Sequence, residues 1–137
     1  MRSTDLLGSE CREFVEGRYG ASIELLVNEL RSRVDESLAK AIARLCEALS
    51  SPIRIEILML LKASGKPLPT CLIAFALGKS PQLVSYHLRS LKSLGLVKEV
   101  QLDKFKLYSI DDRTASKFAK VLAKLASLLE LQEAGEG

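Results

Sequence analysis

The chain has 137 residues, a length that accommodates one compact domain with an extension and excludes two catalytic domains. Hydrophobic residues make up 47% of it and charged residues 27%, which excludes wholesale disorder and a fibrous repeat. The net charge of +3 is unevenly distributed, because residues 79–106 carry six basic and two acidic side chains, a net charge of +4. Such a segment is either an ordinary solvated face or a contact surface for a polyanion.

Apolar residues at helical spacing predict a short N-terminal helix that ends near Gly17 or Gly20. Its apolar face consists of Leu7, Cys11, Phe14 and Val15. A second apolar stripe continues from Ile23 to Leu49 and predicts one helix over about 22–48, or two helices if the chain breaks near Asp35 or Glu36. A small domain cannot cover a stripe of that length, so we expect it to pack against a second copy of the chain.

Serine–proline pairs mark the starts of two further helices, because Ser can cap a helix and the missing N–H of Pro is not needed in the first turn. Ser51-Pro52 predicts a helix to about Ala63, and Ser80-Pro81 predicts one that stops at Gly95. Between them, Pro69 can begin a short helix that Gly78 ends. The expected core residues of the first are Ile55, Leu58, Met59 and Leu61, and those of the last are Val84, Leu88, Leu91 and Leu94.

After Gly95 the apolar period changes from about 3.6 to 2, which is typical of strands. Residues 96–102 and 105–110 alternate around Asp103-Lys104 and predict a β-hairpin whose turn lacks the usual glycine. Asp111-Asp112 then caps a last helix. Its apolar face is wider than one small core requires and consists of Phe118, Val121, Leu122, Leu125, Leu128 and Leu129.

The three helices that begin near Pro52, Pro69 and Pro81 are followed directly by the hairpin, and a tight turn at Gly78 separates the second from the third. This order predicts a mainly α winged helix-turn-helix with a two-stranded wing. Residues 45–61 (LCEALSSPIRIEILMLL) and 68–97 (LPTCLIAFALGKSPQLVSYHLRSLKSLGLV) resemble the ArsR/SmtB regulators over roughly residues 38–112. We expect a dimerisation extension over 1–35, the DNA-binding domain over 36–110, and a C-terminal dimerisation helix with a frayed tail over 111–137.

The polar face of residues 80–94 and the hairpin lysines are the candidate DNA-binding groups. Gln pairs with adenine, Arg with guanine or phosphate, and Ser or Tyr with bases or backbone. Lysines beside the helix and on the wing can meet phosphates, or simply keep the ribbon soluble. The predicted DNA-binding residues are Lys79, Gln82, Ser85, Tyr86, Arg89, Lys92, Lys98, Lys104 and Lys106.

Catalysis and metal binding are poorly supported by the sequence. His87 is the only histidine, so we expect it to be structural, and we expect no enzyme activity and no cofactor. The resemblance implies a metal-sensing Cys pair, but Pro69 and Cys71 occupy its positions. A thiol sensor built from Cys71 and Cys11 of a second subunit is the weaker alternative to cysteines that pack, together with Cys46, as small apolar residues.

The sequence therefore predicts a cytoplasmic homodimer that binds a pseudo-palindromic double-stranded DNA operator, as a repressor, without membrane contact. No apolar stretch is long enough to cross a membrane and no signal peptide is evident. Any small-molecule or metal effector is left open. The alternatives are a winged-helix module that binds another protein, and a repressor that responds to metal or redox state through its cysteines.

Overall fold

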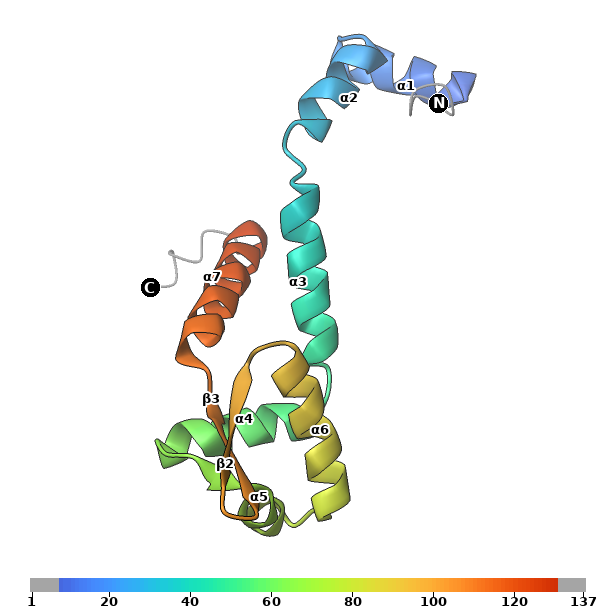
Figure 1. The fold of residues 1–137 in the computed structure, drawn as a ribbon. Helices are drawn as coiled ribbons and strands as arrows, with labels where there is room; N and C mark the ends of the chain where they lie inside the picture. Colours follow the sequence, from blue (N-terminus) through green and yellow to red (C-terminus); the bar gives the residue numbers. More distant parts are fainter. Residues whose placement is uncertain (1–7, 131–137) are drawn as a thin grey trace. The chain divides into compact units, whose positions relative to one another are not determined.

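The computed structural model describes residues 8–130, which form two compact units that divide after Ala39. Figure 1 shows the order of the elements. The first unit contains α1 (Ser9–Tyr19) and α2 (Ile23–Arg31), and α3 (Glu36–Ala48) begins at its end. The second contains α4 (Pro52–Ser64), β1 (Leu68–Pro69), α5 (Thr70–Leu77), α6 (Pro81–Ser93), β2 (Val97–Leu102), β3 (Phe105–Ile110) and α7 (Asp112–Leu129).

The apolar stripe over residues 22–48 forms two helices, as the second of the two sequence alternatives predicts. The helix α2 ends at Arg31, and α3 starts at Glu36, where Asp35 accepts a hydrogen bond from the Leu38 N–H at 3.0 Å. The Asp side chain satisfies a first-turn N–H that has no partner within the helix. The Asp35 cap therefore starts a new helix here, and the chain does not continue as one helix.

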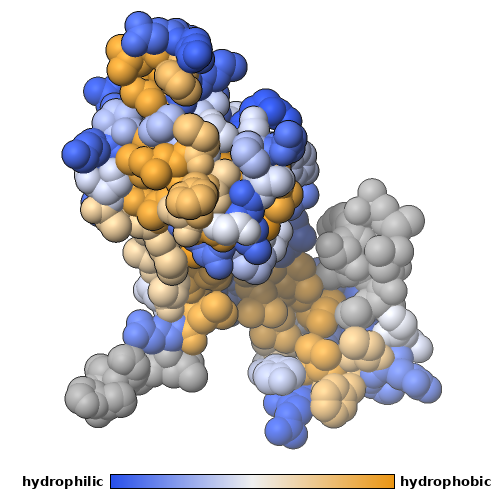
Figure 2. All heavy atoms as spheres, turned by 90° about the horizontal axis from the view of Figure 1, so that it is seen from below, coloured by the Kyte–Doolittle hydropathy of each residue, from blue (hydrophilic) through white to orange (hydrophobic). Residues whose placement is uncertain are grey.

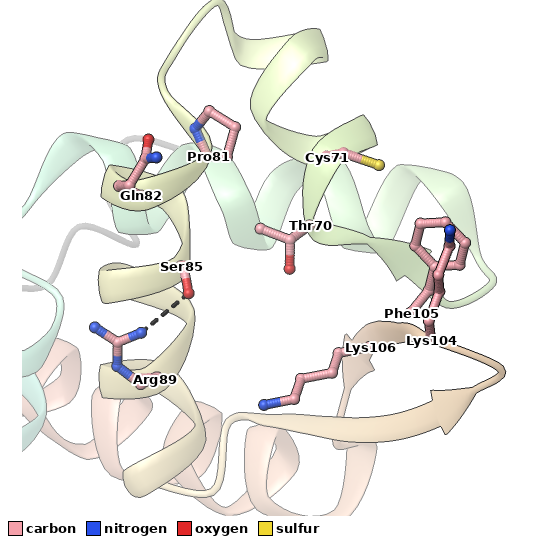
Figure 3. Close-up of a pocket in the computed structure, with 9 residues that line it drawn as sticks. All are labelled: Thr70, Cys71, Pro81, Gln82, Ser85, Arg89, Lys104, Phe105 and Lys106. Carbon is pink, nitrogen blue, oxygen red and sulfur yellow. Dashed lines mark hydrogen bonds between the residues drawn. The ribbon is translucent and has the colours of Figure 1, made fainter.

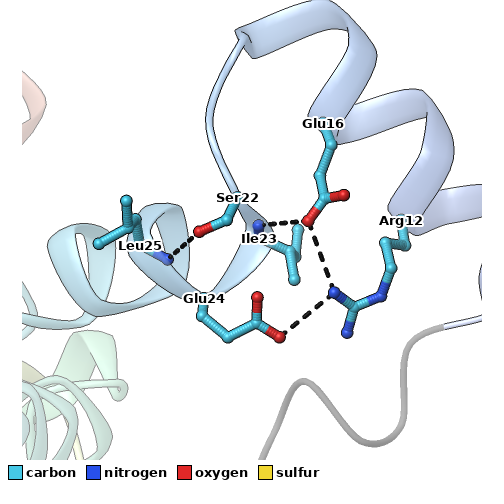
Figure 4. A network of polar contacts seen from close by, with 6 residues as sticks. All are labelled: Arg12, Glu16, Ser22, Ile23, Glu24 and Leu25. Carbon is cyan, nitrogen blue, oxygen red and sulfur yellow. Dashed lines mark hydrogen bonds and ion pairs between the residues drawn. The ribbon is translucent and has the colours of Figure 1, made fainter.

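Side chains of α1 fix the turn into α2 (Figure 4). The Glu16 carboxylate accepts a 2.7 Å hydrogen bond from the Ile23 N–H, and Arg12 lies 3.5 Å from Glu16 and 3.2 Å from Glu24. Ser22 caps α2 by accepting from the Leu25 N–H at 3.3 Å. The predicted end of the first helix is confirmed at Gly20, whose φ of 67° closes α1 in the left-handed region; Leu7 lies outside the described residues.

The core of the second unit consists mainly of aliphatic side chains from α4, α5, α6 and the sheet. Its fully or nearly buried members are Ile57, Leu61, Ile73, Ala74, Val84, Leu88, Leu91, Leu96, Val97 and Tyr108. The predicted core position Met59 is wrong, because 65% of its surface is exposed while Ile57 is fully buried. Residues 57 and 59 differ by about 200° around a helix, so they cannot share a face.

The winged helix-turn-helix is confirmed, with one strand more than the hairpin. The antiparallel sheet has the order β1-β3-β2, and β2 pairs with β3 over its whole length, from Val97 opposite Ile110 to Leu102 opposite Phe105. The two-residue β1 pairs Leu68 with Tyr108 and thereby fastens the start of α5 to the wing. The glycine-free turn is possible because Asp103 adopts a φ of 56°, which Asp tolerates better than most residues.

Glycine and serine set the geometry of the helix-turn-helix itself. Gly78 ends α5 with a φ of 67°, and Ser80 caps α6 by accepting a hydrogen bond from the Leu83 N–H at 3.2 Å. Ser51 occupies the corresponding position before α4, but its side chain makes no cap hydrogen bond. Between residues 8 and 130 no helix is both long and apolar enough to cross a membrane.

Much apolar surface remains exposed in the protomer. The helix α5 exposes Phe75 by 86% and Leu72 by 47%, and Figure 2, seen from the end at which α5 lies, shows apolar surface on this side. The helix α7 buries no residue fully and exposes Leu128 and Leu129 by more than two thirds. The wide apolar face predicted for the last helix is therefore largely uncovered within one chain.

Candidate nucleic-acid interface

The outer face of α6 presents polar side chains because its inner face is fixed by the core. Val84, Leu88 and Leu91 are fully buried, which directs Gln82, Ser85 and Arg89 away from the core. These three lie at i, i+3 and i+7, so they share one stripe of the helix. An Arg89 NH1 hydrogen bond to Ser85 Oγ at 3.0 Å holds the guanidinium along that stripe (Figure 3).

The wing faces this stripe across an open groove. The groove has a volume of about 560 Å³, and Figure 3 shows α6 on one side of it and the wing on the other. The wing contributes Lys104, Phe105 and Lys106, and the first turn of α5 contributes Thr70 and Cys71. The Lys104 ammonium lies 5.8 Å from the centre of the Phe105 ring, a cation–π distance.

A second hollow of about 440 Å³ adjoins the first and shares Thr70, Ser85, Arg89 and Lys106 with it. Here Lys92 of α6 lies 3.1 Å from the carboxylate of Glu99 on β2, and Lys106 lies 4.0 Å from it. The Tyr108 hydroxyl donates a 3.0 Å hydrogen bond to the same carboxylate. This cluster joins the recognition helix to both strands of the wing.

The protonation of this cluster follows from its contacts. The hydrogen bonds from Lys92 and then Tyr108 lower the pKa of Glu99, so its carboxylate is charged at neutral pH. Burial, followed by the hydrogen bond to Glu99 and the charge of Glu99, raises the pKa of Tyr108 to about 12, so its phenol remains a donor.

The structure brings together five of the nine predicted DNA-binding residues in the first groove, and a sixth, Lys92, in the second hollow. Those in the first groove are Gln82, Ser85, Arg89, Lys104 and Lys106. Lys79 is exposed in the turn before α6 and lines neither. Lys98 lines a separate hollow with Lys62 and Lys66, because successive residues of β2 point to opposite faces of the wing.

Tyr86, which is 52% exposed, and buried His87 both contact Arg54. The Arg54 guanidinium donates from Nε to His87 Nδ1 at 3.0 Å and from NH1 to the Ala48 carbonyl at 2.9 Å, and it lies 5.9 Å from the centre of the Tyr86 ring. His87 is buried, with 7% of its surface exposed, which confirms its expected structural role. Burial and then the charge of Arg54 lower the pKa of His87, so it is neutral at pH 7.

The cysteines do not pack in the protomer, and that expectation is wrong. Cys11, Cys46 and Cys71 are all exposed. Within residues 8–130, no three His, Cys, Asp or Glu side chains come together as a metal-binding group.

Several groove residues were not among the predicted site residues. Thr70 and Phe105 carry no charge signal and reach the groove only through β1 and the wing turn. Glu99 did carry a signal, because strand alternation places it on the same face of β2 as buried Val97, where a carboxylate needs a partner.

A helix-turn-helix whose second helix faces a cationic β-wing defines the class of winged helix-turn-helix DNA-binding regulators. Residues 51–99 match the model of the family described as bacterial regulatory protein, arsR family. The HTH-type transcriptional regulator NmtR of Mycobacterium tuberculosis is 35% identical over 98 residues, which cover 72% of each chain. A cadmium resistance transcriptional regulatory protein CadC homolog of Staphylococcus aureus is 35% identical over 85 residues, covering 59% of this chain and 69% of that one.

Solved structures of transcriptional regulators are similar to this chain as well. A homodimeric winged helix-turn-helix DNA-binding domain from Mycobacterium bovis is 31% identical, with a TM-score of 0.53 over 69% of this chain and 87% of that one. An ArsR-like transcriptional regulator from Rhodococcus sp. RHA1 is 27% identical, with a TM-score of 0.54 over 65% and 82%. The chain belongs to the ArsR family of DNA-binding transcriptional regulators, a family of regulators and not of enzymes.

Proposed function

We propose that the chain is a homodimeric, sequence-specific repressor that places α6 in the major groove of double-stranded DNA. The observation that carries this proposal is the groove in which Gln82, Ser85 and Arg89 face Lys104 and Lys106. Amide and guanidinium groups on a recognition helix can make paired hydrogen bonds with adenine and guanine edges, while wing lysines bind phosphates. The uneven charge of the sequence is thereby concentrated where a duplex would lie.

The dimer in this proposal uses the apolar side chains that the protomer leaves uncovered. In the first unit, Phe14, Leu25, Leu30 and Val34 each expose more than 60% of their surface, as Leu128 and Leu129 do on α7. Exposed apolar surface of this extent favours association between subunits. The M. bovis relative is homodimeric, which supports assembly as a dimer. We assign dimerisation to residues 1–35 and 111–137, and DNA binding to 36–110.

Selection of bound sequences from a random DNA pool tests the proposal. A two-fold dimer predicts an inverted repeat whose half-sites lie about 10 base pairs apart, one turn of the duplex. Enrichment of a single half-site would contradict the dimer. Failure to retain any duplex would favour the alternative, a module that binds another protein.

The same selection with Zn²⁺ or an oxidant tests a thiol-responsive repressor. The exposure of Cys71 in the groove is the observation that favours this second candidate. Identical enrichment under all three conditions would exclude it.

A further inference from the structure

Glu99 is a carboxylate among the cations of the proposed DNA-binding surface. It lines the second hollow with Arg89, Lys92 and Lys106, and its side chain is 19% exposed. One of its oxygens, Oε1, accepts from Lys92 Nζ at 3.1 Å and from Tyr108 Oη at 3.0 Å, while Oε2 lies 4.0 Å from Lys106 Nζ. The carboxylate therefore pairs with the same two ammonium groups that a phosphate oxygen would contact.

The hydrogen bond from Tyr108 gives Glu99 a structural role, but that bond does not account for its two lysine partners. Lys92 and Lys106 are 51% and 59% exposed, and ion pairs with such exposed partners contribute little to stability. The wing is already fastened to α6 by buried Leu96, Val97 and Tyr108. The main effect of the Glu99 charge is consequently on the two lysines, whose ammonium groups it attracts toward the wing and partly neutralises.

We propose that Glu99 is a positioning residue that competes with DNA phosphate for Lys92 and Lys106 and so limits the sequence-independent affinity of the protein for DNA. This inference rests on the proposed function. Non-specific binding comes almost entirely from cations that neutralise phosphates. The hydrogen bonds of Glu99 go to Lys92 and Tyr108, so Gln82 and Ser85, the side chains proposed to face bases, keep their role whether or not Lys92 is released.

The Glu99→Gln variant isolates the charge, because an amide oxygen can still accept the hydrogen bond from Tyr108 and the side-chain volume is nearly unchanged. The probe is a fluorescent 25-base-pair duplex of random sequence, titrated by anisotropy between 50 and 300 mM KCl. We expect Glu99→Gln to bind about fivefold more tightly at 100 mM salt, with a slope of log K against log[salt] steeper by about 0.9 for each lysine released. An equal or weaker affinity would overturn the inference.

Two further variants separate this effect from a general change of charge. Glu56→Gln alters the net charge equally, and Glu56 is exposed on α4 and lines neither hollow. It should leave both affinity and slope unchanged. In a Lys92→Gln background, adding Glu99→Gln should gain less than about twofold, because the principal lysine is absent. A full fivefold gain in that background, or from Glu56→Gln, would contradict the proposal.

The wild-type titration tests the proposed function separately. No binding by the wild-type protein at 50 mM salt would refute DNA binding, and the inference with it. Salt-dependent binding by the wild type with no gain in Glu99→Gln would refute only the role of Glu99. Thermal unfolding of each variant establishes that the change in affinity is not a loss of fold.

Discussion

Replacing Arg54 by Ala should destabilise the second unit strongly, because this one side chain links three elements. Its guanidinium joins the end of α3, through the Ala48 carbonyl, to His87 and Tyr86 of α6. Removing it leaves a buried ring nitrogen and a carbonyl oxygen without these donors. In the sequence, Arg54 is a single charge between Ile53 and Ile55 that carries no signal of this role.

The expected loss follows from the two hydrogen bonds, at 2.9 and 3.0 Å. Hydrogen bonds to a charged donor contribute about 1.5–3 kcal/mol each, and the lower value suits a guanidinium that is only partly buried. The Arg54→Ala variant should therefore lose about 3 kcal/mol of unfolding free energy. With a urea dependence of about 2 kcal/mol per molar, the midpoint should fall by about 1.5 M.

Urea unfolding followed by circular dichroism, at one fixed protein concentration, measures this loss. Arg54→Lys retains the charge but not the planar fork, so it should recover less than half of the difference. Arg113→Ala, at an exposed position on α7, is the matched control and should change the free energy by less than about 0.5 kcal/mol. If Arg54→Ala is as stable as this control, the assigned role of the guanidinium is wrong.

Other expected outcomes concern pH, assembly and the wing. The pKa of His87 is lower in the folded protein than its unfolded value of about 6.5, so the stability that neutral His87 contributes is present above pH 6.5 and is lost as the pH falls below it. His87→Gln should therefore reduce the change of the urea midpoint between about pH 7.5 and 5.5. A midpoint that changes with pH as much as in the wild type would contradict this. Leu128→Glu with Leu129→Glu should yield monomers in sedimentation velocity, and a persistent dimer would refute the role given to α7. Lys104→Gln should reduce the salt slope of DNA binding by about one, and Lys98→Gln, which lines a separate hollow, by clearly less; equal effects would refute the assignment of phosphate contacts to the groove.

Local chain signals explain why most of the fold could be predicted. Ser80-Pro81 and Gly78 act within one helical turn of their own positions, so the start of α6 and the turn before it follow from sequence alone. The alternation after Gly95 likewise identifies the hairpin without knowledge of its neighbours.

Features that depend on distant partners could not be predicted in the same way. The segment Ile53–Leu61 is apolar on nearly every side, so periodicity could not distinguish buried Ile57 from exposed Met59. The role of Glu99 depends on a lysine of another element and on the strand register that sets Tyr108 opposite it. Strand β1 consists of two residues and becomes recognisable only through its pairing with β3.

The most direct test of the account measures how a selected operator duplex binds when two cations of the groove are removed. Arg89→Ala with Lys104→Ala should weaken binding on the order of 10- to 100-fold at 150 mM salt and reduce the salt slope by about two. Arg113→Ala with Lys117→Ala removes the same charge from α7 and should alter binding by less than about threefold. An affinity and slope equal to those of this control pair would show that the groove between α6 and the wing does not bind DNA.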